Sequence, residues 1–507
     1  MGGSLSSASP RALDRLALGL LAGVTLLHLC YAGLIALSPQ EAYYWTWSRT
    51  LDLSYFDHPP LAAWTIRLAT ATFGDSERAI RLAAAFHSTV FAVFFWLATR
   101  RLFGSPAALV ALATGLCLPL FALGQVVITP DGPLLSGWAM VLYFTVRALD
   151  EEDGRWLLAA GAAAGWAMLG KYTGGLLLPQ ILVVLALDPR GRRLLRTPWP
   201  WAGAVLALLL FSPVVLWNAR HAFGSFAFQT TERASASHFR PVLVGRFLGL
   251  QAGLITPLVL VLLVDAVIQA FRRHAQASWR LAFWFAAPLL LLAAVISPFH
   301  WVKGNWLAAA YPAALAAAGA LWLEPGRWRP LLARAGVAIA LVGSLYVHLV
   351  PLWPALPFPA KDEGSAGWRG LAARVDGERA RLGPAAFVAG CNYKVSAELG
   401  YYLPGRPRTW SGELAGDHGL QYRLWFDPAE LSGREGIVVR DPRERRTCRR
   451  LPEACTTLEP LPPLEVLRGS ERVTEFELWR CLYGGPPGAE PRPAEGPSPP
   501  TPCMWGG

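Results

Sequence analysis

The chain is poor in charge. Only 16% of its 507 residues are Asp, Glu, Lys or Arg, whereas soluble domains carry about 25%. In addition, 53% of the residues are hydrophobic and the mean hydropathy is +0.34. Low charge and high hydrophobic content together exclude an ordinary soluble protein. The net charge of +11 comes largely from arginines near the ends of apolar runs, so membrane topology explains it better than nucleic-acid binding. We therefore predict an integral membrane protein.

Several signatures of sites are also missing. The sequence has no Cys-x-x-Cys pair and no His/Cys ligand spacing, which argues against a structural zinc site. It has no glycine-rich phosphate loop, which argues against a nucleotide substrate. The first apolar run is too long for the core of a cleavable signal peptide and lacks a small-residue cleavage site. We expect that run to be retained as a membrane span.

Apolar runs recur along the first 350 residues and predict about eleven transmembrane helices. The runs lie at 16–37, 80–99, 107–128, 133–149, 156–170, 174–187, 199–217, 243–268, 279–297, 304–323 and 331–350. Residues 61–78 are expected to form a helix along the membrane surface.

The arginine-dense segments between the runs fit a cytoplasmic N-terminus under the positive-inside rule. Alternation then puts Lys171, Tyr172 and everything after Pro351 on the outer face, together with four loops at 38–78, 129–132, 218–241 and 297–305.

The composition changes near Pro357, where a proline-rich linker begins. We predict a transmembrane domain over 1–356, a small periplasmic α/β domain over 357–483 and a disordered Pro/Gly-rich tail over 484–507. In the α/β domain, strands are expected at 386–389, 436–440 and 473–482, and a helix at 393–403.

Five of the seven cysteines lie in this polar C-terminal part, which fits the oxidising side of a membrane. Cys448 and Cys455 are close in sequence, so we predict that they form a disulfide. Cys391 and Cys481 are a weaker second pair, and Cys503 is left over in the tail.

The stretch 38–60 carries Glu41, Asp57 and His58 among many aromatic side chains. A plain aromatic belt with solvated acids would have the same composition. A helix over EAYYWTWS would put Glu41, Trp45 and Ser48 on one face, which could line a sugar site.

Further polar residues lie in the other outer segments. Asp131 stands between two prolines and could simply cap a helix, and Lys171 could be a snorkelling interfacial lysine. The remaining candidates are also compatible with solvated loops or an aromatic-belt turn; they are Tyr172, Asn218, Arg220, His221, His300, Lys303 and Asn305. Carboxylates and cations on one membrane face suit a reaction on an anionic, lipid-borne substrate.

The segments EAYYWTWS, YFDHPPLAAW, TPDGPL, GKYTG, VLWNARH, VKGNWLAAAYP and NYKVSAELGYYLPGRP follow one another in a familiar order. With them the chain resembles the GT-C glycosyltransferases of the dolichyl-phosphate-mannose protein mannosyltransferase and lipid A aminoarabinose transferase superfamily, and more closely its bacterial family 39-like members. The resemblance implies a GT-C-like helical fold in the bacterial inner membrane. It also implies sugar transfer from a polyprenyl-phosphate donor to a periplasmic-face acceptor, which could be lipid A, another envelope glycan or a protein.

The family's usual Asp-Glu pair appears here as Gln40-Glu41, so the acidic role falls to Glu41, Asp57 or Asp131. The expected reaction is an inverting attack on the anomeric carbon, with Glu41 or Asp57 as base and cations holding the phosphate leaving group. The cation candidates are His58, Lys171, Arg220, His221 and Lys303.

No cofactor is required by this scheme, although an acid pair could recruit a divalent cation. The alternatives are a transporter or flippase of a lipid-linked sugar and, less in keeping with so many spans, an anchored binding protein. A transporter would place ionisable groups near the bilayer midplane, and here they gather at one surface.

Overall fold

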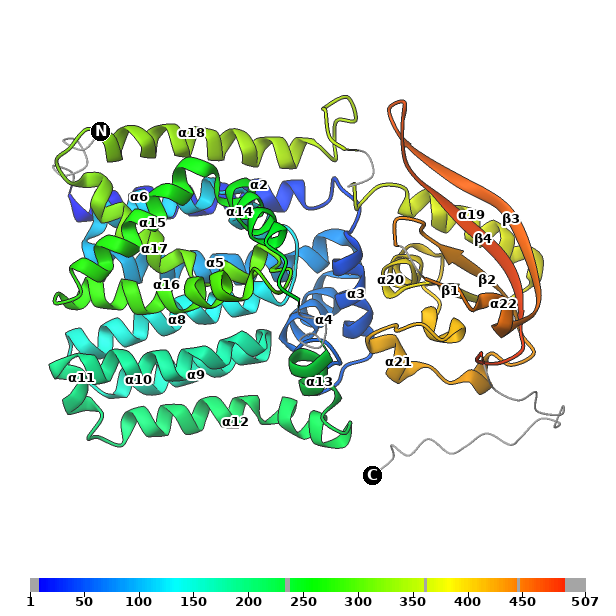
Figure 1. Ribbon diagram of the computed structural model, residues 1–507, viewed down its shortest axis with the longest axis horizontal. Coiled ribbons are helices and arrows are strands. Elements are labelled where there is room, and N and C mark those ends of the chain that lie inside the picture. The colour runs from blue at the N-terminus through cyan, green and yellow to red at the C-terminus, as the bar shows by residue number, and fades with distance from the viewer. Residues whose placement is uncertain (1–8, 233–237, 360–362, 445–446, 488–507) are drawn as a thin grey trace. The chain divides into compact units, whose positions relative to one another are not determined.

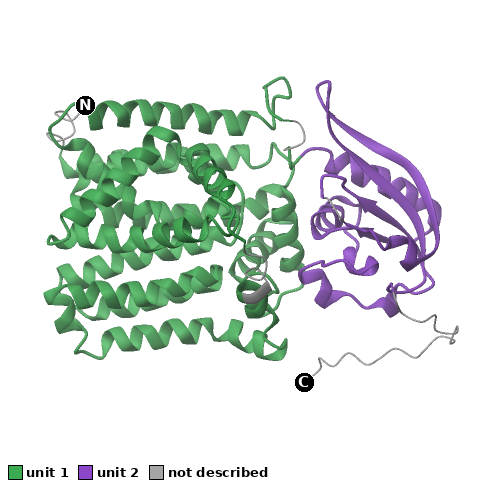
Figure 2. Cartoon of the chain, viewed as in Figure 1, with its two compact units in different colours: residues 1–359, 363–365 green, residues 360–362, 366–507 purple. Residues whose placement is uncertain are grey.

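The structure is a computed structural model and describes residues 9–232, 238–359, 363–444 and 447–487. The chain forms two compact units, residues 1–359 with 363–365 and residues 360–362 with 366–507 (Figure 2). The part of the predicted tail from residue 488 onward, with Cys503, lies outside the described residues.

Unit 1 is built of helices, and its long helices run in nearly the same direction while α3, α4 and α13 gather at one end (Figure 1). In chain order the elements are α2 (Pro10–Tyr31), α3 (Pro39–Arg49), α4 (Leu61–Phe73), α5 (Glu77–Phe103), α6 (Ser105–Cys117), α7 (Pro119–Gly124), α8 (Asp131–Asp150), α9 (Arg155–Gly170), η1 (Tyr172–Leu176), α10 (Leu177–Leu187), α11 (Pro189–Leu194), α12 (Trp199–Arg220), α13 (Gly224–Ala227), η2 (Phe228–Glu232), α14 (Val242–Ile255), α15 (Pro257–Arg272), α16 (Ala277–Ile296), η3 (Gly304–Leu307), α17 (Tyr311–Leu323) and α18 (Trp328–Leu349).

Within the described residues, five helices are long and apolar enough to cross a bilayer, namely α2, α5, α12, α16 and α18. α14 and α15 would add a sixth span, although they meet at a bend of 102°. The predicted count of about eleven is not confirmed, because several expected runs form helices shorter than the roughly 20 residues that a span needs. α9, for example, has 16 residues, and α10 has 11.

The surface helix expected over 61–78 is shorter than predicted. α4 ends at Phe73 because Gly74 takes a positive φ of 79°. Ser76 then starts α5 by accepting a hydrogen bond from the backbone nitrogen of Ala79, which is ordinary N-capping by a serine.

Small residues let α8, α9 and α12 pack closely, as is usual where membrane helices meet. A Cβ on Gly137 of α8 would lie 2.7 Å from the Cβ of Ala167 in α9, and one on Gly161 of α9 would lie 2.1 Å from the carbonyl oxygen of Gly203 in α12. A Cβ on Gly170, at the end of α9, would lie 2.8 Å from the backbone nitrogen of Leu134. The start of α8 and the end of α9 are therefore held side by side.

Unit 2 is a small α/β fold whose elements are α19 (Trp368–Leu382), β1 (Phe387–Gly390), α20 (Tyr393–Tyr402), η5 (Gly412–Ala415), α21 (Gln421–Trp425), η6 (Pro428–Glu430), β2 (Glu435–Arg440), α22 (Leu451–Ala454), β3 (Cys455–Arg468) and β4 (Glu471–Tyr483). The sheet order is β1-β2-β4-β3, with β1 and β2 parallel and the other neighbours antiparallel. Alternate residues of β1 and β2 belong to two different cores, so both faces of the sheet are covered: Val388 and Ile437 pack with α19 and α20, and Ala389 and Val438 pack with the loop segments.

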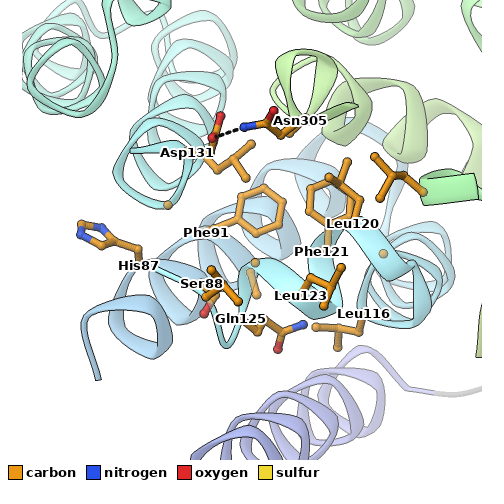
Figure 3. Close-up of a pocket in the computed structure, with 18 of the residues that line it drawn as sticks. His87, Ser88, Phe91, Leu116, Leu120, Phe121, Leu123, Gln125, Asp131 and Asn305 are labelled. Carbon is orange, nitrogen blue, oxygen red and sulfur yellow. Dashed lines mark hydrogen bonds between the residues drawn. The ribbon is translucent and has the colours of Figure 1, made fainter. Parts of the chain in front are cut away.

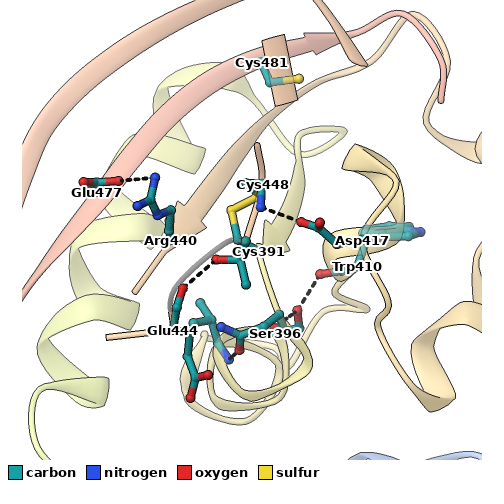
Figure 4. The surroundings of a disulfide bond; sticks show 12 residues. Cys391, Ser396, Trp410, Asp417, Arg440, Glu444, Cys448, Glu477 and Cys481 are labelled. Carbon is teal, nitrogen blue, oxygen red and sulfur yellow. Dashed lines mark hydrogen bonds and ion pairs between the residues drawn. A yellow bond between two sulfur atoms is a disulfide. The ribbon is translucent and has the colours of Figure 1, made fainter. Parts of the chain in front are cut away.

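The disulfides of unit 2 differ from the predicted pairing. Cys391 bonds to Cys448 with a Cα–Cα separation of 5.3 Å (Figure 4). Cys455 bonds to Cys481 with a Cα–Cα separation of 5.5 Å. The predicted pairs Cys448–Cys455 and Cys391–Cys481 are therefore wrong. Cys455 opens β3 opposite Tyr483 of β4, two residues from Cys481, so proximity in the sheet outweighs proximity in sequence.

Candidate active site

Asp131, Lys171 and Asn305 form a polar cluster in unit 1. The Nζ of Lys171 lies 2.8 Å from Oδ1 of Asp131, and the Nδ2 of Asn305 donates to Oδ2 at 2.6 Å (Figure 3). The side chains of Lys171 and Asp131 are 12% and 11% exposed. The carboxylate is thus oriented from both sides and largely shielded from solvent.

The backbone explains why these residues meet. Asp131 is the first residue of α8, after Pro130 at the N-cap position, and no side-chain cap hydrogen bond is present there. The helix-cap interpretation of Asp131 is thereby replaced by an ion pair. Lys171 follows the last residue of α9, and the close contact of α8 with α9 brings the two side chains together.

A cavity of about 380 Å³ adjoins this cluster. Asp131, Asn305 and Thr129 contribute to its lining, and most of the rest is apolar, with Phe91, Phe95, Leu116, Phe121 and Leu315 among the lining residues (Figure 3). Ligand pockets typically combine an apolar wall with a few polar groups that fix orientation. This cavity suits a ligand with a polar end and a hydrocarbon part.

The first outer segment places Asp57 near the same region. Asp57 is 6% exposed, and Oδ1 accepts a hydrogen bond from the Tyr43 hydroxyl at 2.9 Å. Its backbone carbonyl accepts from Nε2 of Gln229 at 2.5 Å. Tyr172, whose hydroxyl lies 2.5 Å from the Oγ of Ser225, packs against a small cluster that includes Leu61 from the first segment. The first segment and the Lys171–Tyr172 segment therefore lie close together.

The same segment is held rigidly by its aromatic side chains. Tyr55 stacks on Trp47 with ring centroids 4.3 Å apart and donates to the Trp47 carbonyl at 3.0 Å. Burial raises the pKa of Tyr55, so its hydroxyl remains a donor at neutral pH. Trp217 of α12 donates to Oδ2 of Asp52 at 2.8 Å, which ties the segment to α12.

Glu41 has a different place from the one predicted. Its side chain is fully buried and ion-pairs with Arg81, and Oε2 also accepts hydrogen bonds from the backbone and hydroxyl of Ser38 in a capping box. The helix predicted over EAYYWTWS forms as part of α3, and Glu41, Trp45 and Ser48 are all buried in it. That this face lines a sugar site stays a prediction. The contacts of Glu41 favour a structural role over the predicted catalytic one.

At the end of α12, Asn218 and His221 make contacts within the protein. Asn218 is buried; its Nδ2 donates to the Val214 carbonyl at 2.9 Å, and its Oδ1 accepts from the Phe226 backbone at 3.2 Å. The His221 ring stacks on Trp217 with centroids 4.0 Å apart. Arg220 is exposed. The amide of Asn218 therefore holds the turn after α12, which argues against its predicted role in binding substrate.

The remaining candidates differ in how far they are exposed. His58 and His300 are half-buried, and Lys303 is exposed. Lys303 lies two residues before Asn305 and precedes η3, and Asn305 donates to the Asp131 carboxylate.

Sequence reasoning missed two residues that matter here. Arg81 lies one residue into a predicted apolar run, where a charge is costly and marks a special position; that signal could have found it. Gln125 also lines the cavity, and no sequence signal singled it out. Within the described ranges, no group of three or more His, Cys, Asp or Glu side chains is arranged to hold a metal ion.

The fold is shared with known membrane enzymes. The crystal structures of ArnT from Cupriavidus metallidurans, apo and bound to undecaprenyl phosphate, match with TM-scores of 0.62 and 0.61 at 18% identity, covering 91% of this chain and 97% of that chain. The mycobacterial arabinofuranosyltransferase AftD matches with a TM-score of 0.51 at 12% identity, covering 94% of this chain and 42% of that one. The chain thus shares the GT-C type of fold with these structures.

Comparison of the amino-acid sequence with known proteins finds similar glycosyltransferases. A sequence model of the family described as dolichyl-phosphate-mannose-protein mannosyltransferase matches residues 57–217. The lipid A galacturonosyltransferase RgtD of Rhizobium johnstonii is 26% identical over 408 residues, which is 78% of this chain and 84% of that protein. An undecaprenyl phosphate-alpha-4-amino-4-deoxy-L-arabinose arabinosyl transferase of Erwinia tasmaniensis is 27% identical over 34% of this chain and 30% of that protein. The chain is thus similar to the GT-C glycosyltransferases of the protein mannosyltransferase and lipid A aminoarabinose transferase superfamily, as the sequence motifs led us to expect.

Proposed function

We propose that the protein transfers a sugar from a polyprenyl-phosphate donor to lipid A. The observation that carries the proposal is the oriented carboxylate of Asp131 at the edge of a mainly apolar cavity. The apolar part suits the first isoprene units of the lipid carrier, and the polar edge suits its head group. The names of the relatives supply the chemical class: lipid A sugar transferases and an enzyme bound to undecaprenyl phosphate.

In the proposed reaction an acceptor oxygen attacks the anomeric carbon as the bond to the lipid phosphate breaks, with inversion. Asp131 or Asp57 accepts the proton when the acceptor is a hydroxyl, a contribution of about 10²–10⁴-fold. The leaving phosphate carries its own negative charge and needs a cation more than a proton. Lys171 is the best-placed cation, since Asp131 and Asn305 hold that region together.

An acceptor phosphate on lipid A would need no strong base. The amide of Gln40, where the family usually has an acid, is compatible with that acceptor. The choice between a phosphate and a hydroxyl acceptor follows from the position at which the sugar is found on the product lipid.

The decisive experiment compares Asp131→Asn with Asp75→Asn in membranes that express equal amounts of the full-length chain. Asp75 pairs with Arg49 and with Trp45 and is absent from the cavity lining, so it is a matched control. We expect Asp131→Asn to lower sugar transfer to lipid A at least a hundredfold and Asp75→Asn to change it less than threefold. Equal activity in both variants would refute the assignment.

A transporter or flippase remains the alternative class, and the named relatives give it no support. Mass spectrometry of lipid A and of lipid-linked sugars, with and without the gene, separates the two. A transferase adds a sugar to lipid A, whereas a flippase alone would leave the sugar on its lipid carrier.

We also propose that the protein lies in the bacterial inner membrane with unit 2 on the periplasmic side. The arginine distribution supports this orientation, and the two disulfides of unit 2 suit an oxidising compartment. An alkaline-phosphatase fusion to the C-terminus should be active and a green-fluorescent fusion dark. The reverse pattern would contradict the orientation.

A further inference from the structure

Two segments of unit 1 that are distant in sequence lie side by side. They are residues 238–246, which lead into and begin α14, and residues 297–303, which follow α16. The backbone nitrogen of Arg240 donates to the carbonyl of Pro298 at 2.7 Å, so a backbone hydrogen bond joins the two segments. We call the surface that they form the arginine–aromatic patch.

The patch exposes large apolar side chains. Phe239, Val242 and Trp301 are 66%, 62% and 68% exposed. The rings of Phe239 and Phe299 meet edge to face with centroids 5.7 Å apart, so the aromatic surface extends across both segments. Exposed aromatic rings in membrane proteins settle at the membrane–water interface. The patch therefore suits contact with a lipid at the level of its head group.

The same surface is rich in cationic side chains. Arg240 and Arg246 are exposed, and neither forms an ion pair within the residues that the structure describes. Arg246 lies four residues after the exposed Val242 in α14, which puts both side chains on one face of that helix. Neither segment contains Asp or Glu. Guanidinium groups bind phosphate oxygens through paired hydrogen bonds, so the patch suits an anionic head group that carries phosphate.

Both segments lead from the patch to the candidate active site. The segment after α16 continues into η3, where Asn305 donates to the Asp131 carboxylate. The segment before α14 continues into that helix, and Leu250 of α14 lines the cavity. The helix rises by only about 6 Å between Arg246 and Leu250. A head group held at the patch therefore lies close to the cavity.

The patch is nevertheless separate from the cavity itself. Among the described residues, the cavity lining includes no residue of the two segments. In the proposed function the cavity takes the lipid-linked donor, so the second substrate has to approach from outside it. A plain interfacial anchor would expose the same aromatic rings. The direct connection to Asn305 and to α14 favours a surface that takes part in the reaction.

We propose that the arginine–aromatic patch docks the acceptor, lipid A, through the phosphate groups of its head group. Arg240 and Arg246 bind the phosphates, while Phe239, Val242 and Trp301 contact the lipid at the membrane interface. The proposal rests on the proposed transferase function and assigns a binding surface to its second substrate. Changes at the two arginines should therefore affect lipid A and leave the donor lipid unaffected.

The test uses the full-length protein in nanodiscs of phosphatidylcholine, which has no net charge. The double variant Arg240→Gln/Arg246→Gln removes both charges and keeps polar side chains. Arg192→Gln/Arg196→Gln is the matched control, because these arginines are also exposed and form no ion pair within the described residues. They precede α12, at the opposite end of that helix from α13 (Figure 1).

Binding is measured for lipid A with its phosphates, for the same lipid without phosphates and for undecaprenyl phosphate. Wild type and the control should bind phosphorylated lipid A at least tenfold more tightly than the dephosphorylated lipid. In the patch variant this preference should fall below twofold, and KM for lipid A in sugar transfer should rise at least tenfold. Its kcat, its binding of undecaprenyl phosphate and its melting temperature should match those of the control.

Three outcomes would overturn the docking surface. One is that phosphatidylglycerol competes as well as lipid A at equal mole fraction, which would make the patch a general anchor for anionic phospholipids. Another is that the patch variant loses binding of undecaprenyl phosphate to the same extent, which would assign the arginines to the donor. The third is unchanged binding of lipid A in the patch variant.

The same measurements separate this inference from the transferase function. If wild type transfers sugar to lipid A and the patch variant does so with unchanged KM, the transferase function stands and the docking surface fails. If wild type transfers no sugar but binds phosphorylated lipid A through the two arginines, the transferase function fails and the docking surface is supported on its own.

Discussion

Arg81 and Glu41 form a buried two-point ion pair. Nε and Nη2 of Arg81 each lie 2.9 Å from a carboxylate oxygen of Glu41, and the two side chains are 1% and 0% exposed. The remaining guanidinium donors bind the carbonyls of Ala32, Ile35 and Ala36. This pair therefore joins α5 to α3 and to the segment after α2.

Glu41→Gln should lower stability before it affects chemistry. The substitution leaves the Arg81 charge buried without its anion, and removing one partner of a buried pair typically costs about 3–5 kcal/mol. We expect a lower melting temperature and a lower yield of folded protein in a thermal-shift assay. Gln40→Ala, one residue earlier and half-buried, is the control and should change little. A tenfold loss of turnover with a normal melting temperature would restore Glu41 to the catalytic site.

Asp57→Asn should reduce transfer at least tenfold in kcat/KM, because it removes a buried charge close to the Lys171–Tyr172 segment. Tyr43→Phe removes only one hydrogen bond to that carboxylate, which is worth about 1 kcal/mol or roughly fivefold. Radiolabelled sugar transfer in matched membranes measures both variants. Near wild-type activity in Asp57→Asn would leave Asp131 as the acid that carries the reaction.

Glu413 should make unit 2 less stable as the pH rises towards neutrality. Burial raises the pKa of this carboxyl from 4.5 to about 7, even though the Gly419 backbone donates a hydrogen bond to it. The folded state then binds the proton more tightly than the unfolded state, so stability is greatest below pH 4.5 and falls as the pH rises through 7. Burial also raises the pKa of Asp417, which adds in the same direction.

The measurement is hydrogen exchange of unit 2 in the full-length protein at pH 5 and pH 8. Glu413→Gln should reduce the difference in protection between the two pH values. An unchanged difference would show that another group is responsible.

Non-reducing peptide mapping should find the pairs Cys391–Cys448 and Cys455–Cys481. They close sequence separations of 57 and 26 residues, and chain-entropy arguments give about 4 and about 3.5 kcal/mol of stabilisation. Cys391→Ser should therefore destabilise unit 2 slightly more than Cys455→Ser. A peptide that links Cys448 to Cys455 would contradict the structure.

Much of the fold follows from local pattern. The predicted strands at 386–389, 436–440 and 473–482 correspond to β1, β2 and β4, and the predicted helix at 393–403 corresponds to α20. β3 was missed because prolines interrupt its alternation. The predicted span count is not confirmed, because hydropathy marks apolar runs, whereas the length test for a span also needs an unbroken helix.

The site was harder to predict, because its contacts join distant parts of the chain. Asp131, Lys171 and Asn305 were each identified from sequence, but their meeting depends on how α8 and α9 pack and on where η3 lies. Glu41 was predicted to be catalytic because its ion-pair partner, Arg81, is 40 residues away and no local pattern links the two residues. Sequence reasoning found the residue types that suit the reaction and could not tell which of them are used within the fold.

The outer strand β3 limits the addition of further strands to the sheet of unit 2. β3 is an outer strand, and Pro460, Pro462 and Pro463 lie within it, the last two where its register with β4 shifts. A proline has no backbone N–H, so this edge of the sheet cannot form a regular set of backbone hydrogen bonds with a strand from another molecule. Replacing the three prolines with threonine would create a continuous row of donors. The expected consequence is self-association of unit 2 through strand addition.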